Sequence, residues 1–123
     1  MKDTSEPIDR STYDALVAMT GGDHEFVDDL VGTYLTDLVE QLAALDAVVA
    51  GGDPTALVRP AHSMKSSSLN VGALELGRLC RELEEQGRAG QFDGAVERVA
   101  DVHRQSELVR AALLARRAED AKV

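Results

Sequence analysis

AHSMKSSSLNVGA, residues 61–73, is a polar segment in the middle of an otherwise apolar, helical pattern. His62 and Lys65 stand one helical turn apart in it, and three consecutive serines follow. Gly72 then offers the backbone freedom with which helices commonly end. The stretch therefore predicts a helix that stops near residue 70 and a second helix that begins directly after the glycine.

Glycine and proline divide the rest of the chain at TGGD (20–23), GGDP (51–54) and GRAG (87–90). Between these points apolar residues recur at spacings of three and four, the pattern of one buried helical face. We expect long helices over about 24–50, 54–70, 73–88 and 93–115, and a short helix over 11–19. Ser11, Asp23 and Asp53 are placed to cap helix starts, and Gly51 to end the first long helix.

Short loops between long helices imply antiparallel neighbours. The predicted fold is therefore all-α, an antiparallel up-down-up-down four-helix bundle with a short N-terminal helix, in a single domain over 1–123. Pro60 should kink its helix, because it removes a backbone hydrogen bond and clashes with the preceding turn. Residues 1–8 and about 116–123 are expected to be flexible ends, the latter because apolar periodicity is lost there.

The apolar spacing also predicts which residues face the core of this bundle. The expected inward-facing residues are Val27, Leu30, Val31, Tyr34, Leu38, Leu42, Leu45, Val49, Leu57, Ala61, Met64, Ser68, Leu76, Leu79, Cys80, Leu83, Val96, Val99, His103, Ser106, Val109 and Leu113.

The composition excludes several classes of function. Of the 123 residues, 44% are hydrophobic and only 3% aromatic, so the core should consist of Leu, Val and Ala. The formal net charge of −9 argues against binding to nucleic acid or to an anionic membrane surface. The N-terminal MKDTSEPIDR shows no secretory signal, and no apolar run approaches the ~20 residues of a membrane span. Cys80, the only cysteine, should be a buried thiol in a reduced compartment, which favours the cytoplasm.

Two kinds of catalytic site fit the sequence poorly. A di-iron centre in a helical bundle needs Glu-x-x-His pairs, and none of His24, His62 and His103 has a glutamate three residues before it. We therefore expect no metal site. A hydrolase needs a nucleophile, a base and a group that orients the base. Ser66 lies one turn from His62, but no acidic residue is placed nearby in the sequence to orient the imidazole.

Helical spacing places three residues on the same face as His62, namely Lys65, Ser66 and Leu69. His62 should point to solvent with Lys65 beside it. Neutral imidazole is nucleophilic near neutral pH, so His62 could attack a phosphoryl group held by another protein while Lys65 stabilises the developing charge. A merely solvated helix face is the alternative, although four serines here cost about 2 kcal/mol relative to alanine.

The segment AHSMKSSSLNVGALELGRLCRELEEQGRAG resembles the histidine-containing phosphotransfer (HPt) domain of multistep phosphorelays. The family signature is Ala-His-x-Leu-Lys-Gly-Ser-Ser, then a small segment ending in Leu-Gly-Ala, then Leu-x-x-Leu-Cys-x-x-Leu-Glu. The chain matches this signature from Ala61 to Glu84. GGDHEFVDDLVGTYLTDLVEQLAAL and GGDPTAL also resemble the family, so the resemblance covers about residues 8–115.

This resemblance implies a four-helix bundle in which His62 accepts a phosphoryl group from an aspartyl phosphate of one receiver domain and passes it to another receiver aspartate. Lys65 would assist near the phosphate. Such a domain is a carrier rather than an enzyme, because it has no ATP site. The receiver of a response regulator or hybrid kinase would supply Mg²⁺, and the chain, expected to be a monomer, would need no cofactor of its own.

Two departures from the family bear on the site: Ser66 stands where glycine is most frequent, and Met64 replaces the usual leucine. In addition, some members place a glutamine near the imidazole, and the aligned residue here is Glu84. The charge of Glu84 would disfavour a phosphate if it pointed that way, so its role is left open, as is that of Arg88. The expected docking residues are Ser63, Ser66 and Leu69. The alternative function is a non-catalytic four-helix adaptor that binds receiver or kinase domains without carrying phosphate.

Overall fold

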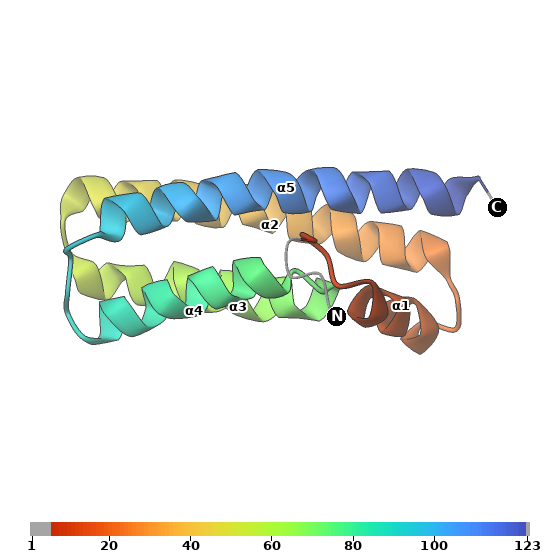
Figure 1. Ribbon diagram of the computed structural model, residues 1–123, viewed down its shortest axis with the longest axis horizontal. Helices are drawn as coiled ribbons and strands as arrows, with labels where there is room; N and C mark the ends of the chain where they lie inside the picture. Colours follow the sequence, from red (N-terminus) through yellow and green to blue (C-terminus); the bar gives the residue numbers. More distant parts are fainter. Residues whose placement is uncertain (1–5, 123) are drawn as a thin grey trace.

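The computed structural model describes residues 6–122, which are almost entirely helical (Figure 1). The helices are α1 (Arg10–Met19), α2 (His24–Gly51), the short 3-10 helix η1 (Pro54–Leu57), α3 (Val58–Val71), α4 (Leu74–Arg88) and α5 (Ala95–Ala121). The predicted all-α bundle is thus confirmed. The flexible start expected over 1–8 falls, for residues 1–5, outside the described part of the chain. Between residues 6 and 122, none of the helices combines the length and apolar character that a membrane crossing requires.

The two longest helices, α2 and α5, run antiparallel along the length of the molecule (Figure 1). His103 of α5 and Asp46 of α2 join them through a 2.8 Å contact between Nε2 and Oδ1. The antiparallel hairpin of α3 and α4 packs against one half of this pair, and α1 lies beyond the hairpin against the other half (Figure 1). Tyr13 of α1 is buried there, with the Arg116 guanidinium of α5 4.5 Å from its ring centroid.

Short polar residues and a left-handed glycine set several helix boundaries as predicted. Asp23 begins α2 by accepting a 3.1 Å hydrogen bond from the backbone of Phe26, and Asp53 begins η1 by accepting one from Thr55, also 3.1 Å. Gly72 ends α3 with φ of +90°, a conformation that other residues rarely adopt. The polar run of α3 and the start of α4 are therefore separated where the sequence indicates.

Two predicted boundary residues are wrong. The cap of α1 is Asp9 rather than Ser11, and its Oδ2 accepts a 3.1 Å hydrogen bond from the backbone of Thr12. An ionised carboxylate at this position also interacts favourably with the helix dipole. At the other end of the bundle, Gly51 is still helical and Gly52 takes the left-handed conformation that ends α2.

Pro60 does not kink a continuous helix, contrary to the prediction. The chain instead forms η1 over Pro54–Leu57 and begins α3 at Val58. Pro60 therefore lies in the first turn of α3, where the backbone N–H that proline lacks has no partner within the α-helix. The change of helix type comes before the proline and leaves the rest of α3 regular.

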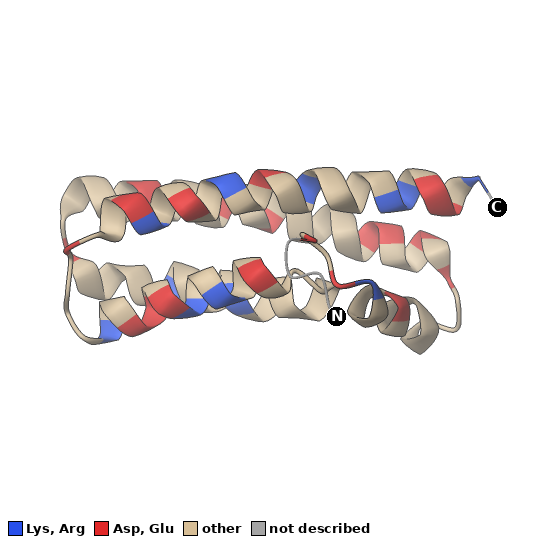
Figure 2. Ribbon diagram, in the orientation of Figure 1, with Lys and Arg blue, Asp and Glu red and all other residues tan. Residues whose placement is uncertain are grey.

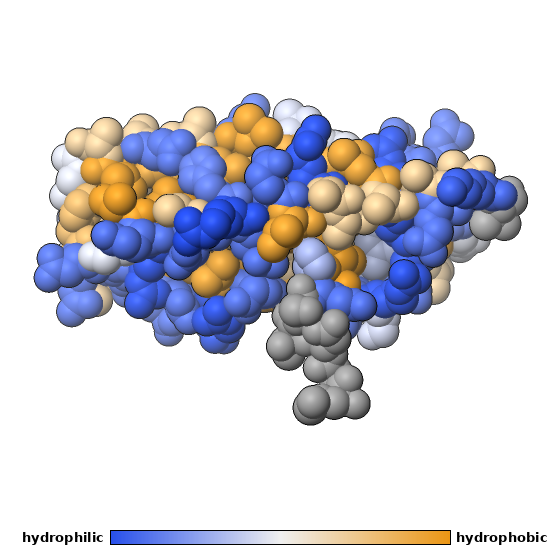
Figure 3. All heavy atoms as spheres, turned by 45° about the horizontal axis from the view of Figure 1, so that its top comes forward, coloured by the Kyte–Doolittle hydropathy of each residue, from blue (hydrophilic) through white to orange (hydrophobic). Residues whose placement is uncertain are grey.

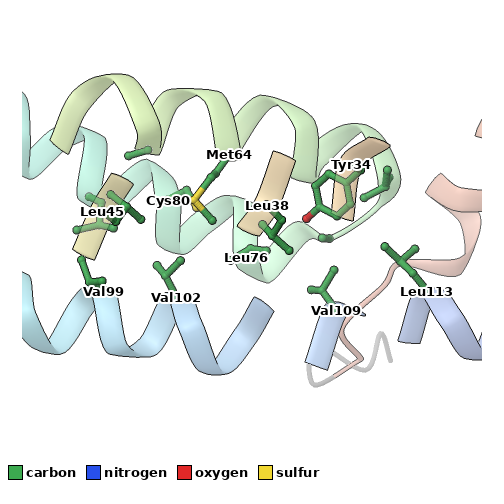
Figure 4. Close-up of a cluster of buried hydrophobic side chains, with 14 of the residues drawn as sticks. Tyr34, Leu38, Leu45, Met64, Leu76, Cys80, Val99, Val102, Val109 and Leu113 are labelled. Atoms are coloured by element: carbon green, nitrogen blue, oxygen red, sulfur yellow. The ribbon is translucent and has the colours of Figure 1, made fainter. Parts of the chain in front are cut away.

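The core is a row of mostly aliphatic side chains between the four long helices (Figure 4). Tyr13 and Tyr34 contribute buried rings to it, and the hydroxyl of Tyr34 lies 2.8 Å from the buried Oγ of Ser68, which satisfies both groups. Cys80 is a buried free thiol as predicted, and burial raises its pKa to about 12. The other predicted inward residues that are buried are Val27, Val31, Leu38, Leu45, Leu57, Ala61, Met64, Leu76, Leu83, Val99, Ser106, Val109 and Leu113.

Three predicted inward residues instead reach the surface. Leu30 and Val96 are 38% and 53% exposed, and the side chain of His103 is 42% exposed. On α5 the buried stripe uses Val99 and Val102, one position before His103, so the imidazole flanks the core rather than entering it. On the face that Figure 3 shows, hydrophobic side chains form separate patches among hydrophilic ones.

The C-terminal helix extends past residue 116, where the loss of apolar periodicity predicts fraying. Arg116 forms ion pairs with one residue of α1 and one residue of α5. Its Nη2 lies 2.7 Å from Asp14 of α1, and its Nε lies 3.0 Å from Asp120, one turn later on α5. Ion pairs therefore continue the packing of α5 after the apolar stripe has ended.

Residues of both charge signs occur along α4 (Figure 2). Arg78 lies 2.6 Å from Glu75 and 2.5 Å from Glu82, and Arg98 of α5 reaches the same Glu82 at 2.9 Å. These ion pairs are on the surface, where each contributes only about 0–1 kcal/mol to stability. They link α4 to α5 without setting the geometry of the core.

Gly87 of α4 lies where this helix passes η1. A Cβ atom there would lie 2.9 Å from the Pro54 carbonyl oxygen and 2.9 Å from Cγ2 of Val58. We expect Gly87→Ala to lower the free energy of unfolding by roughly 1–3 kcal/mol, as overpacking does. Gly32→Ala in α2 should instead raise it by about 0.5–1 kcal/mol, because nothing lies within 4 Å of the added methyl group. Urea denaturation of both variants checks the pair, and a stabilised Gly87→Ala protein would contradict the close approach.

Candidate functional site

His62 projects from α3 to the surface of the bundle. Its side chain is 56% exposed, while the neighbouring Ala61 and Met64 are buried in the core. The helix face that carries the imidazole is therefore the one that the spacing of the sequence predicts. Because the opposite face of α3 is fixed by packing, the imidazole is presented on a rigid element.

A buried carboxylate on α4 contacts the imidazole. The side chain of Glu84 is only 7% exposed, and its Oε2 lies 3.0 Å from Nδ1 of His62. The same oxygen accepts a 2.8 Å hydrogen bond from Nη2 of Arg88, and Oε1 lies 2.7 Å from Nζ of Lys65. One carboxylate thus joins the two residues predicted to act on phosphate with the Arg88 whose role the sequence left open.

Lys65 lies on the same side of α3 but does not extend into solvent. Its side chain is 24% exposed and turns toward α4, where it pairs with the buried Glu84. Removing one partner of a buried ion pair costs far more stability than removing a surface one. Lys65 therefore has a structural role in addition to its place beside the imidazole.

The partners of Glu84 keep it ionised. The hydrogen bond from Lys65 has the largest effect, followed by that from Arg88, and together with His62 they lower the pKa of Glu84 to about 2 against the opposing effect of burial. An ionised carboxylate only accepts hydrogen bonds, so Nδ1 of His62 must be the ring nitrogen that carries hydrogen. In the neutral imidazole the lone pair then lies on Nε2, which has no hydrogen-bond or ion-pair partner among residues 6–122.

Glycines on α4 let it approach α3 and η1 closely on either side of Glu84. A Cβ atom at Gly77 would lie 2.5 Å from Cδ2 of Leu69 on α3, and Gly87 is similarly confined against η1. Sequence reasoning missed this role. Glycine within a strongly periodic helix is the available signal, because it lowers helix stability and is usually kept for packing.

The structure provides one of the two contacts that a hydrolase site needs, the group that orients the base, but not the contact between nucleophile and base. Glu84 is the acidic residue that orients the imidazole, and it comes from a different helix, 22 residues along the chain. The expectation that no such residue is available was therefore wrong. Ser66, however, makes no hydrogen bond to His62 in the described chain, and it is exposed on the surface of α3. The pairing of a serine with the base, which nucleophilic hydrolysis needs, is not formed.

The expected docking residues all reach the surface. Ser63 and Ser66 are exposed, and Leu69 is 42% exposed. Sequence reasoning missed a largely apolar groove of about 580 Å³ that begins at Leu69, about 10 Å along the helix axis from His62. Its lining comes from three helices and comprises Thr12, Ala15, Leu16, Met19, Leu30, Thr33, Tyr34, Asp37, Ser67, Leu69, Asn70 and Val71.

The low pKa of Glu84 predicts a pH dependence of stability. In an unfolded chain a glutamate titrates near 4.3, whereas folded Glu84 titrates at about 2. The stability that ionised Glu84 contributes is therefore complete above about pH 4.5 and is lost as the pH falls toward 2. Between these values the wild-type protein should lose more unfolding free energy than Glu84→Gln.

Urea denaturation at several pH values measures this difference. Glu85→Gln is the matched control, because Glu85 is the exposed neighbour on α4. The unfolding free energy of Glu85→Gln should fall with decreasing pH as steeply as that of the wild-type protein. Parallel stability curves for wild type and Glu84→Gln would show that the ion pairs of Glu84 do not depend on its charge.

Comparison with known proteins adds to this geometry. The Hpt domain family matches residues 29–121. Multistep phosphorelay regulator 1 of Schizosaccharomyces pombe is 28% identical over 91 residues, which cover 73% of this chain and 31% of that protein, so the chain spans about a third of that relative. The crystal structure of histidine-containing phosphotransfer protein B (HptB) from Pseudomonas aeruginosa PAO1 superimposes with a TM-score of 0.83 at 29% identity, covering 94% of this chain and 98% of that one. The helical bundle, the exposed histidine and these matches lead to one conclusion: the chain belongs to the Hpt domain family.

Proposed function

We propose that this chain is a phosphorelay carrier and that His62 is the residue that carries the phosphoryl group. One observation supports the assignment of the residue. The imidazole is exposed, its Nδ1 donates to an ionised carboxylate 3.0 Å away, and its Nε2 is left with a lone pair that faces no partner in residues 6–122. This is the state in which imidazole acts as a nucleophile.

In the proposed transfer, Nε2 of His62 attacks the phosphorus of an aspartyl phosphate in a receiver domain. The bond from phosphorus to the aspartate oxygen breaks, and a bond from phosphorus to Nε2 forms. The reverse sequence passes the group to the aspartate of a second receiver. Lys65, which Glu84 holds beside the imidazole, supplies positive charge where the phosphoryl oxygens gather. The carrier needs no ATP site or cofactor of its own in this scheme, and the Mg²⁺ belongs to the receiver.

We propose further that the receiver docks over the exposed serines next to His62 and onto the apolar groove beyond them. Ser63 and Ser66 leave space above the helix, and Leu69 continues the surface into the groove. A receiver that covered both would seat its aspartate over Nε2 while burying apolar side chains. The chain acts in the cytoplasm as a monomer in this proposal.

Phosphate mapping tests the proposed function. The protein is incubated with phosphorylated receiver domains, and the modified residue is located by mass spectrometry under conditions that preserve phosphohistidine. We expect a single acid-labile, base-stable phosphate on His62. Receiver binding without any phosphate transfer would favour the adaptor alternative instead.

A further inference from the structure

The contact between Glu84 and His62 bears on the phosphorylated state as well as on the resting one. Glu84 bonds to Nδ1, the ring nitrogen on the opposite side from Nε2. A phosphoryl group on Nε2 therefore leaves this contact in place. The carboxylate is 7% exposed, so water competes with it poorly for the Nδ1 hydrogen.

The chemistry of a phosphorylated imidazole depends on that hydrogen. When Nδ1 is protonated, breaking the bond between phosphorus and Nε2 releases a neutral imidazole, which is a good leaving group. When Nδ1 is bare, the same step must release an imidazole anion, which is a poor one. A negative charge in contact with Nδ1–H favours the protonated form, because opposite charges stabilise each other at this distance.

We propose that Glu84 is a positioning residue that keeps Nδ1 of phosphorylated His62 protonated at neutral pH, and that it thereby makes the phosphoryl group easy to release. This inference rests on the proposed function. In the step it favours, an aspartate oxygen of a receiver or the oxygen of water forms a bond to phosphorus. The bond from phosphorus to Nε2 breaks, its electron pair returns to Nε2, and the hydrogen stays on Nδ1. When water is the acceptor, its proton passes to the phosphate that leaves.

The other charged groups around Glu84 are few. From α3 they are His62 itself and Lys65, and on α4 the partner is Arg88. The 3-10 helix η1 has no charged residue, and the ion pair between α5 and α4 goes from Arg98 to Glu82. Both cations in contact with Glu84 help to keep it ionised, so the carboxylate retains its charge across the pH range in which a phosphohistidine titrates.

The test measures how fast phosphate is lost from His62 at different pH values. Wild-type protein and the variants Glu84→Gln and Glu85→Gln are phosphorylated directly with phosphoramidate, the reagent is removed, and the decay is followed by ³¹P NMR from pH 5 to 9. Glutamine keeps a hydrogen-bond acceptor for Nδ1–H but removes the charge. We expect Glu84→Gln to lose phosphate about tenfold more slowly at pH 8, which corresponds to a shift of about one pH unit in the protonation of Nδ1.

The pH profile distinguishes this role from a structural one. The decay rates of wild type and Glu84→Gln should converge at pH 5, where both rings are protonated, and Glu85→Gln should follow the wild type throughout. Nitrogen-15 NMR of the phosphorylated ring should show Nδ1 protonated at pH 8 only in the proteins that retain Glu84. Equal decay rates at pH 8, or a difference that persists unchanged to pH 5, would overturn the inference. If phosphoramidate does not label His62 in any of the proteins, the proposed function itself has failed.

Discussion

Replacing His62 by Gln is expected to abolish phosphoryl uptake from a phosphorylated receiver while leaving the bundle folded. The amide of glutamine has no nucleophilic lone pair, so no bond to phosphorus can form. Its side chain can still donate a hydrogen bond to Glu84, and the imidazole it replaces is 56% exposed. We therefore expect helical circular dichroism and melting temperature close to those of the wild type, with labelling reduced to background.

The other two histidines are the matched controls. His24 lies 3.6 Å from Asp120, and His103 lies 2.8 Å from Asp46. Both imidazoles thus pair with carboxylates on the surface of α2 and α5, away from the α3–α4 hairpin. His24→Gln and His103→Gln should take up phosphate at the wild-type rate. Labelling of His62→Gln at the wild-type level would rule out the assignment of His62.

Local sequence signals were sufficient to predict the α-helices and the face that carries His62, but not the 3-10 helix η1. Asp23, Asp53 and Gly72 act on neighbours within a few residues, so their effect can be foreseen without the fold. The orientation of His62 also follows from spacing alone, because Ala61 and Met64 take the buried positions of the same helix. The burial of residues near the edge of a buried stripe is harder to predict. His103 is an example, because it lies one position beyond the buried Val102 and therefore flanks the core.

The contacts of the site depend on how two helices are placed against each other, which helical spacing does not give. Glu84 reaches His62 and Lys65 only because α4 packs closely on α3, with Gly77 and Gly87 on either side of it. The family resemblance located Glu84 near the imidazole without showing which way its charge would act. In the structure the charge is balanced by two cations, so it orients the ring instead of merely repelling phosphate. The apolar groove could not be predicted from helical spacing either, because its walls come from three separate helices.

Ser66→Arg is expected to block transfer to His62 while leaving the protein folded. Ser66 is exposed one turn beyond His62, so a large side chain there would occupy the space that a receiver needs in order to bring its aspartate to Nε2. Arginine also has a higher helix propensity than serine, so α3 loses no stability from the change. The transfer rate should fall at least tenfold, or about 1.4 kcal/mol in activation free energy, with an unchanged melting temperature. Ala111→Arg, an exposed position on α5, is the control for added bulk and charge and should transfer normally.

Ser68→Arg should instead destabilise the fold, although Ser68 lies only two residues after Ser66 in the same polar run. Ser68 is fully buried, and its Oγ lies 2.8 Å from the hydroxyl of Tyr34. An arginine there would place an unpaired charge in the core and leave the tyrosine hydroxyl without its partner, which costs several kcal/mol. The bundle should therefore melt at a much lower temperature, and transfer should be lost together with the fold. Melting curves and transfer rates measured on both variants separate the two roles of the serine run. Normal transfer by folded Ser66→Arg would show that no partner approaches His62 over this turn, and the adaptor alternative would then need another surface.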